Sequence, residues 1–228
     1  MTSIDGAEPT DGAEPGTRRR YHHGDLERAL VEEALAQVRA RGADEVSLRQ
    51  VAQAVGVSPS AAYAHFPDKQ ALLVAVGNAG KEVMDGRIIA ANEAVTGDGD
   101  AAAVERFRAT GRAYVAFAVE ESHLFRHMFG PACVMQRQHE ARGGGGGGPA
   151  EESVSYRMLN SGLDDLEARG LLRPGVREGL DLAAWTMVHG FSALVLDGFL
   201  PIEAGEILVD TLSRLALTEA ARTLIART

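Results

Sequence analysis

Residues 47–66 read SLRQVAQAVGVSPSAAYAHF and predict two short helices joined by a tight turn. Ser47, with a glutamine three residues later, has the pattern of a capping box, and Gly56 ends the first helix after about two turns. Ser58 and Pro59 begin the second helix, because a proline in the first turn lacks only an N–H that would have no partner there. This stretch is therefore typical of a helix-turn-helix.

Two helices that cross closely need a small residue at their contact, and residue 52 is an alanine. Gly56 can adopt the positive φ that the turn requires. Apolar residues fill the wedge between the helices, and they are Val51, Val55, Val57 and Ala62. The second helix is then free to enter a major groove, with outward or groove-facing positions predicted for Ser60, Ala61, Tyr63 and His65.

The whole chain is predicted to be all-α. It is 45% hydrophobic and only 5% aromatic, it is rich in helix-forming residues, and it lacks extended period-two alternation. A three-helix DNA-binding domain is expected over 21–70 and a larger helical domain over 71–228. Residues 1–20 are expected to form a disordered acidic tail and a basic arm, and 143–149 a flexible glycine loop.

Caps and stop signals give the expected helices. Asp25 is a plausible N-cap for the first, which Gly42 ends, and Asp68 caps a long connecting helix. The later helices are expected at 69–94, 101–120, 122–130, 151–169, 176–199 and 204–222.

The charge is unevenly distributed along the chain. The net charge is −9, yet residues 1–16 hold four acids and no base, and 17–70 hold eight bases against seven acids. Residues 71–228 hold 15 bases against 21 acids. A protein that binds nucleic acid without regard to sequence is usually basic overall, so these numbers argue against a nucleoid-structuring protein. Any DNA binding should be confined to the N-terminal module.

No apolar run reaches the roughly 20 residues of a membrane span, and residues 1–16 lack the apolar core of a signal peptide. We therefore expect a cytoplasmic protein with no membrane partner. The single cysteine, Cys133, cannot form an intrachain disulfide and is interpreted as a structural thiol, with redox sensing as the alternative. We expect no cofactor.

Metal binding and catalysis are two alternative functions that the sequence must be tested against. His123 and His127 lie four residues apart, with Cys133 and His139 nearby, which a transition metal could use. A His-x-x-x-His pair alone is common, however, so no metal is predicted. An enzyme carrying a helix-turn-helix, such as a recombinase, would need clustered acids or a nucleophile with its base, and no such group is evident.

Three segments resemble the TetR/AcrR regulators. They are YHHGDL at 21–26, SLRQVA with GVS within 47–58, and AYAHFPDKQAL at 62–72. A second signal, Trp185 with the triplet at 188–190 (Val-His-Gly), is similar to the WHG-type C-terminal domain of one branch of that family. The resemblance implies an all-helical homodimer whose N-terminal helices bind DNA and whose C-terminal helices bind a small molecule and form the dimer contact.

The resemblance also implies individual roles. DNA contacts are expected for Arg20, Ser47, Arg49, Ser58, Ser60, Ala61, Tyr63, His65 and Lys69. Tyr63 and Lys69 are interpreted as phosphate contacts, and the alanine-rich reading face suggests that phosphate contacts and DNA shape carry much of the affinity. The implied function is that of a ligand-released repressor on a palindromic operator, with activation left open.

The aromatic residues, methionines and histidine of the larger domain allow two interpretations: they line a ligand site or they form its core. The candidates are Phe107, Tyr114, Phe117, Met128, Met158, Trp185 and His189. The last two expected helices look too apolar for a monomer. A four-helix dimer contact is therefore expected from Ala184, Val188, Phe191, Val195, Leu208, Leu212 and Leu215.

Overall fold

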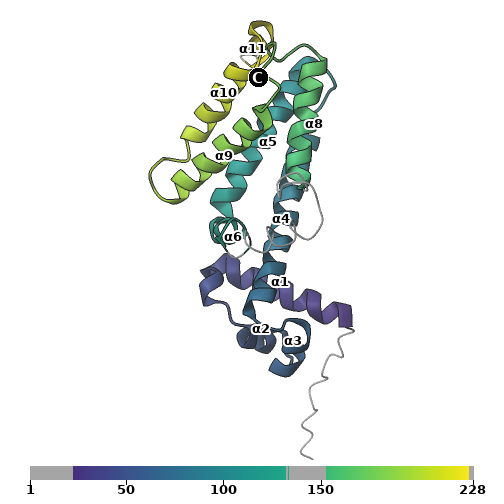
Figure 1. Ribbon diagram of the computed structural model, residues 1–228, viewed down its shortest axis with the longest axis vertical. Coiled ribbons are helices and arrows are strands. Elements are labelled where there is room, and N and C mark those ends of the chain that lie inside the picture. Colours follow the sequence, from purple (N-terminus) through teal and green to yellow (C-terminus); the bar gives the residue numbers. More distant parts are fainter. Residues whose placement is uncertain (1–22, 132, 134–152, 226–228) are drawn as a thin grey trace, which may run out of the picture.

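The computed structural model describes residues 23–131, 133 and 153–225, and within these ranges every regular element is a helix. The molecule is elongated (Figure 1), with the N-terminal helices at one end and a helical bundle at the other. The N-terminal elements are α1 (His23–Arg41), η1 (Ala43–Glu45), α2 (Leu48–Val55) and α3 (Pro59–His65). The others are α4 (Lys69–Glu93), α5 (Asp100–Glu120), α6 (Ser122–Met128), α8 (Val154–Ala168), α9 (Leu180–Leu196), α10 (Ala204–Ala216) and α11 (Glu219–Ile225). The all-α prediction is confirmed.

The local signals of the helix-turn-helix form as predicted. Ser47 Oγ accepts a hydrogen bond from the backbone N–H of Gln50 at 3.2 Å, which caps α2. Gly56 follows α2 with φ of 83°, a left-handed conformation that suits glycine. Ser58 Oγ accepts from the N–H of Ala61 at 3.2 Å and caps α3.

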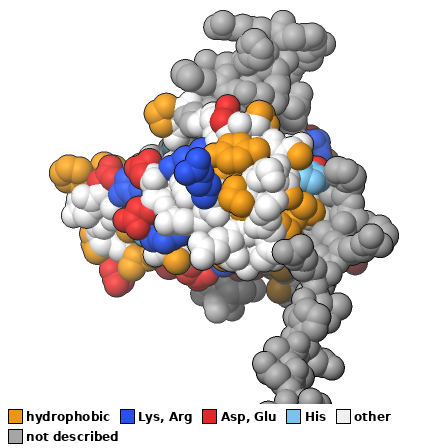
Figure 2. All heavy atoms as spheres, turned by 90° about the horizontal axis from the view of Figure 1, so that it is seen from below, with side chains coloured by type: hydrophobic (Ala, Val, Ile, Leu, Met, Phe, Trp, Pro, Cys, Tyr) orange, Lys and Arg blue, Asp and Glu red, His pale blue; other side chains and the backbone are white. Residues whose placement is uncertain are grey.

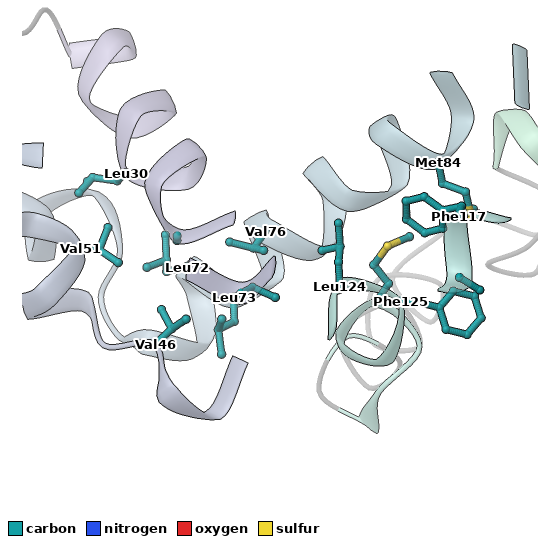
Figure 3. Close-up of a cluster of buried hydrophobic side chains, with 14 of the residues drawn as sticks. Leu30, Val46, Val51, Leu72, Leu73, Val76, Met84, Phe117, Leu124 and Phe125 are labelled. Atoms are coloured by element: carbon teal, nitrogen blue, oxygen red, sulfur yellow. The ribbon is translucent and has the colours of Figure 1, made fainter. Parts of the chain in front are cut away.

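Two alanines allow α2 and α3 to pack closely. Ala52 and Ala62 are both fully buried, as are Leu30 of α1, Val51 of α2 and Leu72 of α4. All five side chains belong to one buried cluster, and Figure 3 shows Leu30, Val51 and Leu72 of this core. Because the small residues leave no room for a larger side chain, the crossing of the two helices depends on them.

α4 is shared by both domains. Leu72 and Val76 pack in the N-terminal core, whereas Met84 and Ile88 on the same helix pack in the bundle. Asp68 caps α4 by accepting from the N–H of Ala71 at 2.8 Å, as expected from the sequence. The two domains are thus joined by one continuous helix and one continuous hydrophobic core.

α4 also makes a close contact with the segment around α6. A Cβ built on Gly80 would lie 2.7 Å from Met128 Sδ, and a Cβ on Gly77 would lie 2.8 Å from Cys133 Sγ. These glycines let the backbone of α4 approach α6 more closely than any other residue would permit.

α8 is also attached to α4. Ser153, which precedes α8, makes no capping bond with its own side chain. Instead Asp85 Oδ1, from the middle of α4, accepts hydrogen bonds from the N–H of Ser155 at 3.0 Å and from its hydroxyl. A carboxylate from one helix therefore caps the first turn of another.

The bundle departs from prediction at its helix ends. The single helix expected over 204–222 is two helices, because the chain is extended at Leu217 and pairs there with Leu172 in an isolated antiparallel bridge. Leu217 is fully buried, so its burial favours the break. α9 begins at Leu180 and not at 176, because Gly179 before it is left-handed. The predicted glycine loop at 143–149 lies outside the described residues.

Candidate functional site

The outer face of the helix-turn-helix carries the candidate nucleic-acid interface. Arg49, Ser58, Ser60 and Tyr63 are exposed, and the Tyr63 side chain is among the exposed large apolar groups, at 44%. Figure 2 views the molecule from this end and shows hydrophobic side chains beside a small group of Lys and Arg side chains. Such a surface offers few charges and few hydrogen bonds to base edges.

Three residues that were predicted to contact DNA are less exposed to solvent than Arg49 and Tyr63. The His65 side chain is only 9% exposed, and its Nδ1 lies 3.8 Å from Glu27 Oε2 of α1. It therefore turns toward α1 and not outward, contrary to the prediction. Ala61 is half-buried against the core. Lys69 donates to the backbone carbonyl of Asp44 at 2.7 Å, which holds its ammonium group at the junction of η1 and α4.

Sequence reasoning missed two polar residues beside Arg49. Gln50 is exposed in the first turn of α2, and its Oε1 accepts from Arg41 Nη2 at 3.4 Å. Arg41 is the last residue of α1, so only the folded arrangement brings it to this face. Ser47 is half-buried and its hydroxyl is engaged in the cap. Arg20 lies outside the described residues.

A second candidate site is a cluster of rings between α5, α6 and α9, which we call the aromatic cluster: Tyr114, Phe125, Phe129, Trp185 and His189. Its centre is His189, whose ring centroid lies 4.6 Å from that of Phe129, 5.4 Å from Phe125 and 6.0 Å from Trp185. The hydroxyl of Tyr114 and Nδ1 of His189 form a hydrogen bond of 2.9 Å. Three helices thus converge on one imidazole.

The electrostatics of the cluster favour a neutral imidazole. Burial lowers the pKa of His189 below its usual value, so the ring is uncharged at neutral pH. At the edge, Tyr156 packs edge-on against Trp185 and donates to Asp181 Oδ2. This hydrogen bond lowers the pKa of Asp181, which keeps it ionised beside Arg177, whose Nη1 lies 3.7 Å from Asp181 Oδ1.

Four other residues predicted for the ligand site lie elsewhere or deeper. Phe107 belongs to the second core, around Leu163 and Leu217, and not to the aromatic cluster. Phe117 is fully buried against Phe125. Met128 fills the space above Gly80, and Met158 is half-buried on α8. Phe107, Phe117 and Met128 are buried packing positions, whereas Tyr114, Trp185 and His189 of the predicted set come together in the aromatic cluster.

α6 and the residue before it join the aromatic cluster to the N-terminal domain. Glu121, 12% exposed, forms ion pairs with Arg39 of α1 at 2.9 Å and with Arg87 of α4 at 3.0 Å. Nε2 of His127, on α6, forms a hydrogen bond of 2.7 Å with the backbone carbonyl of Leu73 on α4. Phe125 lies on α6 and Phe129 directly follows it, so the short helix that contacts α4 also carries one ring of the aromatic cluster and ends at another.

Metal and membrane readings find no support in the described part of the chain. No group of three His, Cys, Asp or Glu side chains there could hold a metal ion. His127 and Cys133 form only a pair, with Nε2 and Sγ 3.6 Å apart, and His139 lies outside the described residues. No described helix is both long and apolar enough to cross a bilayer.

The predicted dimer residues are mostly internal. Ala184, Val188, Phe191 and Leu212 are buried within the protomer, where α9 and α10 pack on α5, so they are not available to a second copy. Val195 and Leu208 are half-buried, and only Leu215 is openly exposed, at 53%. A different apolar face is exposed on α9, α10 and the loop between them, comprising Leu182, Leu194, Phe199, Leu200, Ile202, Ile207 and Leu215. The helical stripe was identified correctly as apolar but assigned to the wrong neighbour.

Comparison with solved structures shows the same fold over nearly the whole chain. A protein of unknown function from Rhodococcus sp. RHA1 is 28% identical, with a TM-score of 0.67, covering 88% of this chain and 100% of that one. A regulatory protein of the TetR family from Rhodococcus RHA1 is 17% identical, with a TM-score of 0.55 and coverage of 85% and 98%. RolR, solved with the ligand resorcinol, is 18% identical, with a TM-score of 0.60 and coverage of 90% and 95%.

Family models match both domains. The model of bacterial regulatory proteins of the tetR family matches residues 30–76, which include the helix-turn-helix. The model of the tetracyclin repressor-like C-terminal domain matches residues 107–226, more than half of the chain, and this range includes Trp185 and His189. No curated protein sequence matches. The chain belongs to the TetR family of bacterial regulatory proteins.

Proposed function

We propose that this protein is a sequence-specific repressor that acts as a cytoplasmic homodimer on a palindromic operator and is released by a small molecule. The observation that carries the proposal is the position of α6. It contacts α4 through Leu124 and Met128, while Phe125 on the same helix packs on His189. A molecule that moves the rings therefore moves the helices that hold α3, the recognition helix of the helix-turn-helix.

The DNA-binding part rests on the exposed face of α3 and the start of α2. The exposed side chains of Arg49, Ser60 and Tyr63 reach phosphates and base edges when α3 lies in a major groove. Ser58 and Ser60 are hydrogen-bonded to each other through their hydroxyls at 2.9 Å, which leaves one proton of the pair for DNA. Lys69 has two ammonium protons beyond the one bound to Asp44, and Arg20 supplies charge from the arm.

The dimer rests on the exposed apolar face of α9 and α10. Figure 1 shows these two helices along one side of the bundle. Leu194 on α9 and Ile207 and Leu215 on α10 are 44%, 68% and 53% exposed. A twofold axis on this face would pair α9 and α10 with the same helices of a second copy and bury all three side chains.

The effector part rests on the aromatic cluster. Phe129, Trp185 and His189 are half-buried, Tyr114 and Phe125 are buried beneath them, and together they form a mainly apolar surface with few polar groups, as small-molecule sites generally do. RolR, which shares the fold, has been solved with a small molecule, resorcinol. Release requires that the ligand bind the DNA-unfit state more tightly by several kcal/mol.

Selection of bound sequences from random DNA by the full chain tests the proposal. We expect an inverted repeat whose half-sites lie about 34 Å apart, one helical turn or a multiple of it. Binding should weaken as salt rises, because phosphate contacts release counterions. Recovery of DNA without a common sequence would contradict a sequence-specific regulator.

Replacing Tyr63 by Phe tests the assigned phosphate contact. The ring stays and the hydroxyl is lost, so binding should weaken by about tenfold, the typical value of a hydrogen bond to a charged group. Fluorescence anisotropy with the selected operator and with single-base variants measures the effect. All variants should weaken alike. A changed base preference with unchanged affinity would show that Tyr63 reads a base.

Replacing Glu121 by Gln tests the ion pairs that Glu121 forms with Arg39 of α1 and Arg87 of α4. Arg39 and Arg87 would lose a shared carboxylate, and we expect unfolding to become easier by about 1 to 2 kcal/mol, since both arginines are one-third exposed. Denaturation followed by the fluorescence of Trp185, the single tryptophan, measures it. Glu82→Gln, an exposed change on α4, is the control and should stay within about 0.5 kcal/mol. Equal stabilities would refute a structural tie at Glu121.

A further inference from the structure

The aromatic cluster contains two nitrogens without a hydrogen-bond partner among the described residues. His189 uses Nδ1 for Tyr114, and no group is bound to its Nε2. Trp185, one turn earlier on α9, has ring contacts with Tyr156 and His189 but no acceptor for its indole N–H. Neither nitrogen is among the buried atoms that lack a partner, so both remain accessible. Two polar groups, Nε2 of His189 and the indole N–H of Trp185, thus lie on one face of α9 within a group of rings.

We propose that the effector is an uncharged aromatic molecule that carries at least one free hydroxyl group. This inference rests on the proposed function, since it gives the chemical class of the ligand that would release the operator. The ring of the ligand packs on the accessible sides of Phe129, Trp185 and His189, where aromatic pairs prefer edge-on or offset geometry. Its hydroxyl binds the two free nitrogens.

A hydroxyl group suits the site better than other polar groups. The bond between Tyr114 and His189 can have its proton on either side, so Nε2 of His189 is a donor in one tautomer and an acceptor in the other. A hydroxyl serves both tautomers, whereas a carbonyl or an ether oxygen serves only one. The indole N–H of Trp185 is always a donor and matches a hydroxyl oxygen.

The charges around the cluster favour a neutral ligand. The imidazole of His189 is uncharged at neutral pH because burial lowers its pKa. Arg177, beside Asp181, is held by Asp164 at 2.6 Å and by Asn160 at 2.9 Å, and Arg126, next to Phe125, is held by Asp197 at 2.8 Å. An anion in the cluster would find both of these arginines already paired, and burying an unpaired carboxylate is costly. The carboxylate of Asp181, which a cation would need, already binds Tyr156 and Arg177.

The test compares four probes of similar size on the full chain. They are phenol, anisole, benzoate and cyclohexanol, and binding is followed by quenching of Trp185 fluorescence and by the thermal midpoint. Phenol should bind about tenfold more tightly than anisole, which has no O–H to donate, and than cyclohexanol, whose ring is not aromatic. Benzoate should bind most weakly. Benzoate binding tighter than phenol, or anisole matching phenol, would overturn the proposal.

Two substitutions locate the site. His189→Phe keeps a ring and removes Nε2, and Trp185→Phe keeps a ring and removes the indole N–H, so each should weaken phenol by about tenfold, measured by the thermal midpoint. Ser161→Ala, which removes an exposed hydroxyl on α8, is the control and should leave phenol affinity unchanged. Unchanged phenol affinity in a folded Trp185→Phe variant would place the ligand elsewhere.

The same samples separate two failures. If the selected operator binds but no hydroxylated ring is bound, the ligand class is wrong and the regulator stands. If phenol binds with the expected preference but no DNA sequence is selected, the proposed function is wrong while the binding site stands. If phenol binds and releases the operator, both are supported.

Discussion

Replacing Ala52 by Leu should abolish tight operator binding. Ala52 is fully buried where α2 crosses α3, and its carbonyl oxygen accepts from the N–H of Val57 at 2.9 Å in the turn. Three additional carbon atoms cannot fit there without moving α3, and overpacking of this kind costs about 1 to 3 kcal/mol or more. The recognition helix would then stand away from its groove, and we expect operator affinity to fall by about 100-fold.

Gel shift and anisotropy with the selected operator measure this loss, and circular dichroism shows that the remaining helices persist. Ala36→Leu introduces the same side chain at an exposed position of α1, so it should leave operator affinity within about twofold. Tight binding by both variants would mean that the crossing of α2 and α3 tolerates a larger residue, and the small contact at Ala52 would lose its assigned role.

Replacing Ile207 by Asp should convert the protein to monomers. Ile207 is 68% exposed in the single chain and lies on the apolar face of α10. In a twofold dimer the change brings two carboxylates into one apolar interface, and the cost is several kcal/mol. The dissociation constant of the dimer should rise by about 100-fold or more. Operator affinity should fall with it, because a monomer contacts only one half-site.

Analytical ultracentrifugation over a range of concentrations measures the association, and the same samples are titrated with operator. Ser161→Asp adds the same charge at an exposed position on α8 and should leave a dimer. A dimer that persists in Ile207→Asp would place the interface on another surface. A monomeric parent protein that binds a full palindrome tightly would contradict the twofold arrangement.

The sequence was sufficient for the helix-turn-helix because its signals are local. The caps at Ser47, Ser58 and Asp68 each depend on a backbone N–H three residues later, and the turn depends on one glycine. Such contacts are present in any conformation in which the helix forms, so neighbours in space do not alter them.

The features that the sequence did not reveal depend on neighbours distant in the chain. The apolar stripe of α9 was assigned to a second copy, but α5 of the same chain covers Val188 and Phe191. The break at Leu217 is set by its bridge to Leu172, 45 positions earlier, and the His65 side chain lies toward Glu27 of α1, 38 positions earlier. Periodicity shows that a face is apolar and not which partner covers it.

The continuity of α4 has a geometric consequence. With 25 residues and a rise of about 1.5 Å per residue, the helix is roughly 38 Å long. A rotation of about 5° around its C-terminal end displaces its first residue by roughly 3 Å, and in a twofold dimer the separation of the two α3 helices could change by up to about twice that amount. Successive turns of the major groove lie about 34 Å apart. A rearrangement of a few degrees at the aromatic cluster is therefore enough to make the separation of the two α3 helices differ from this spacing.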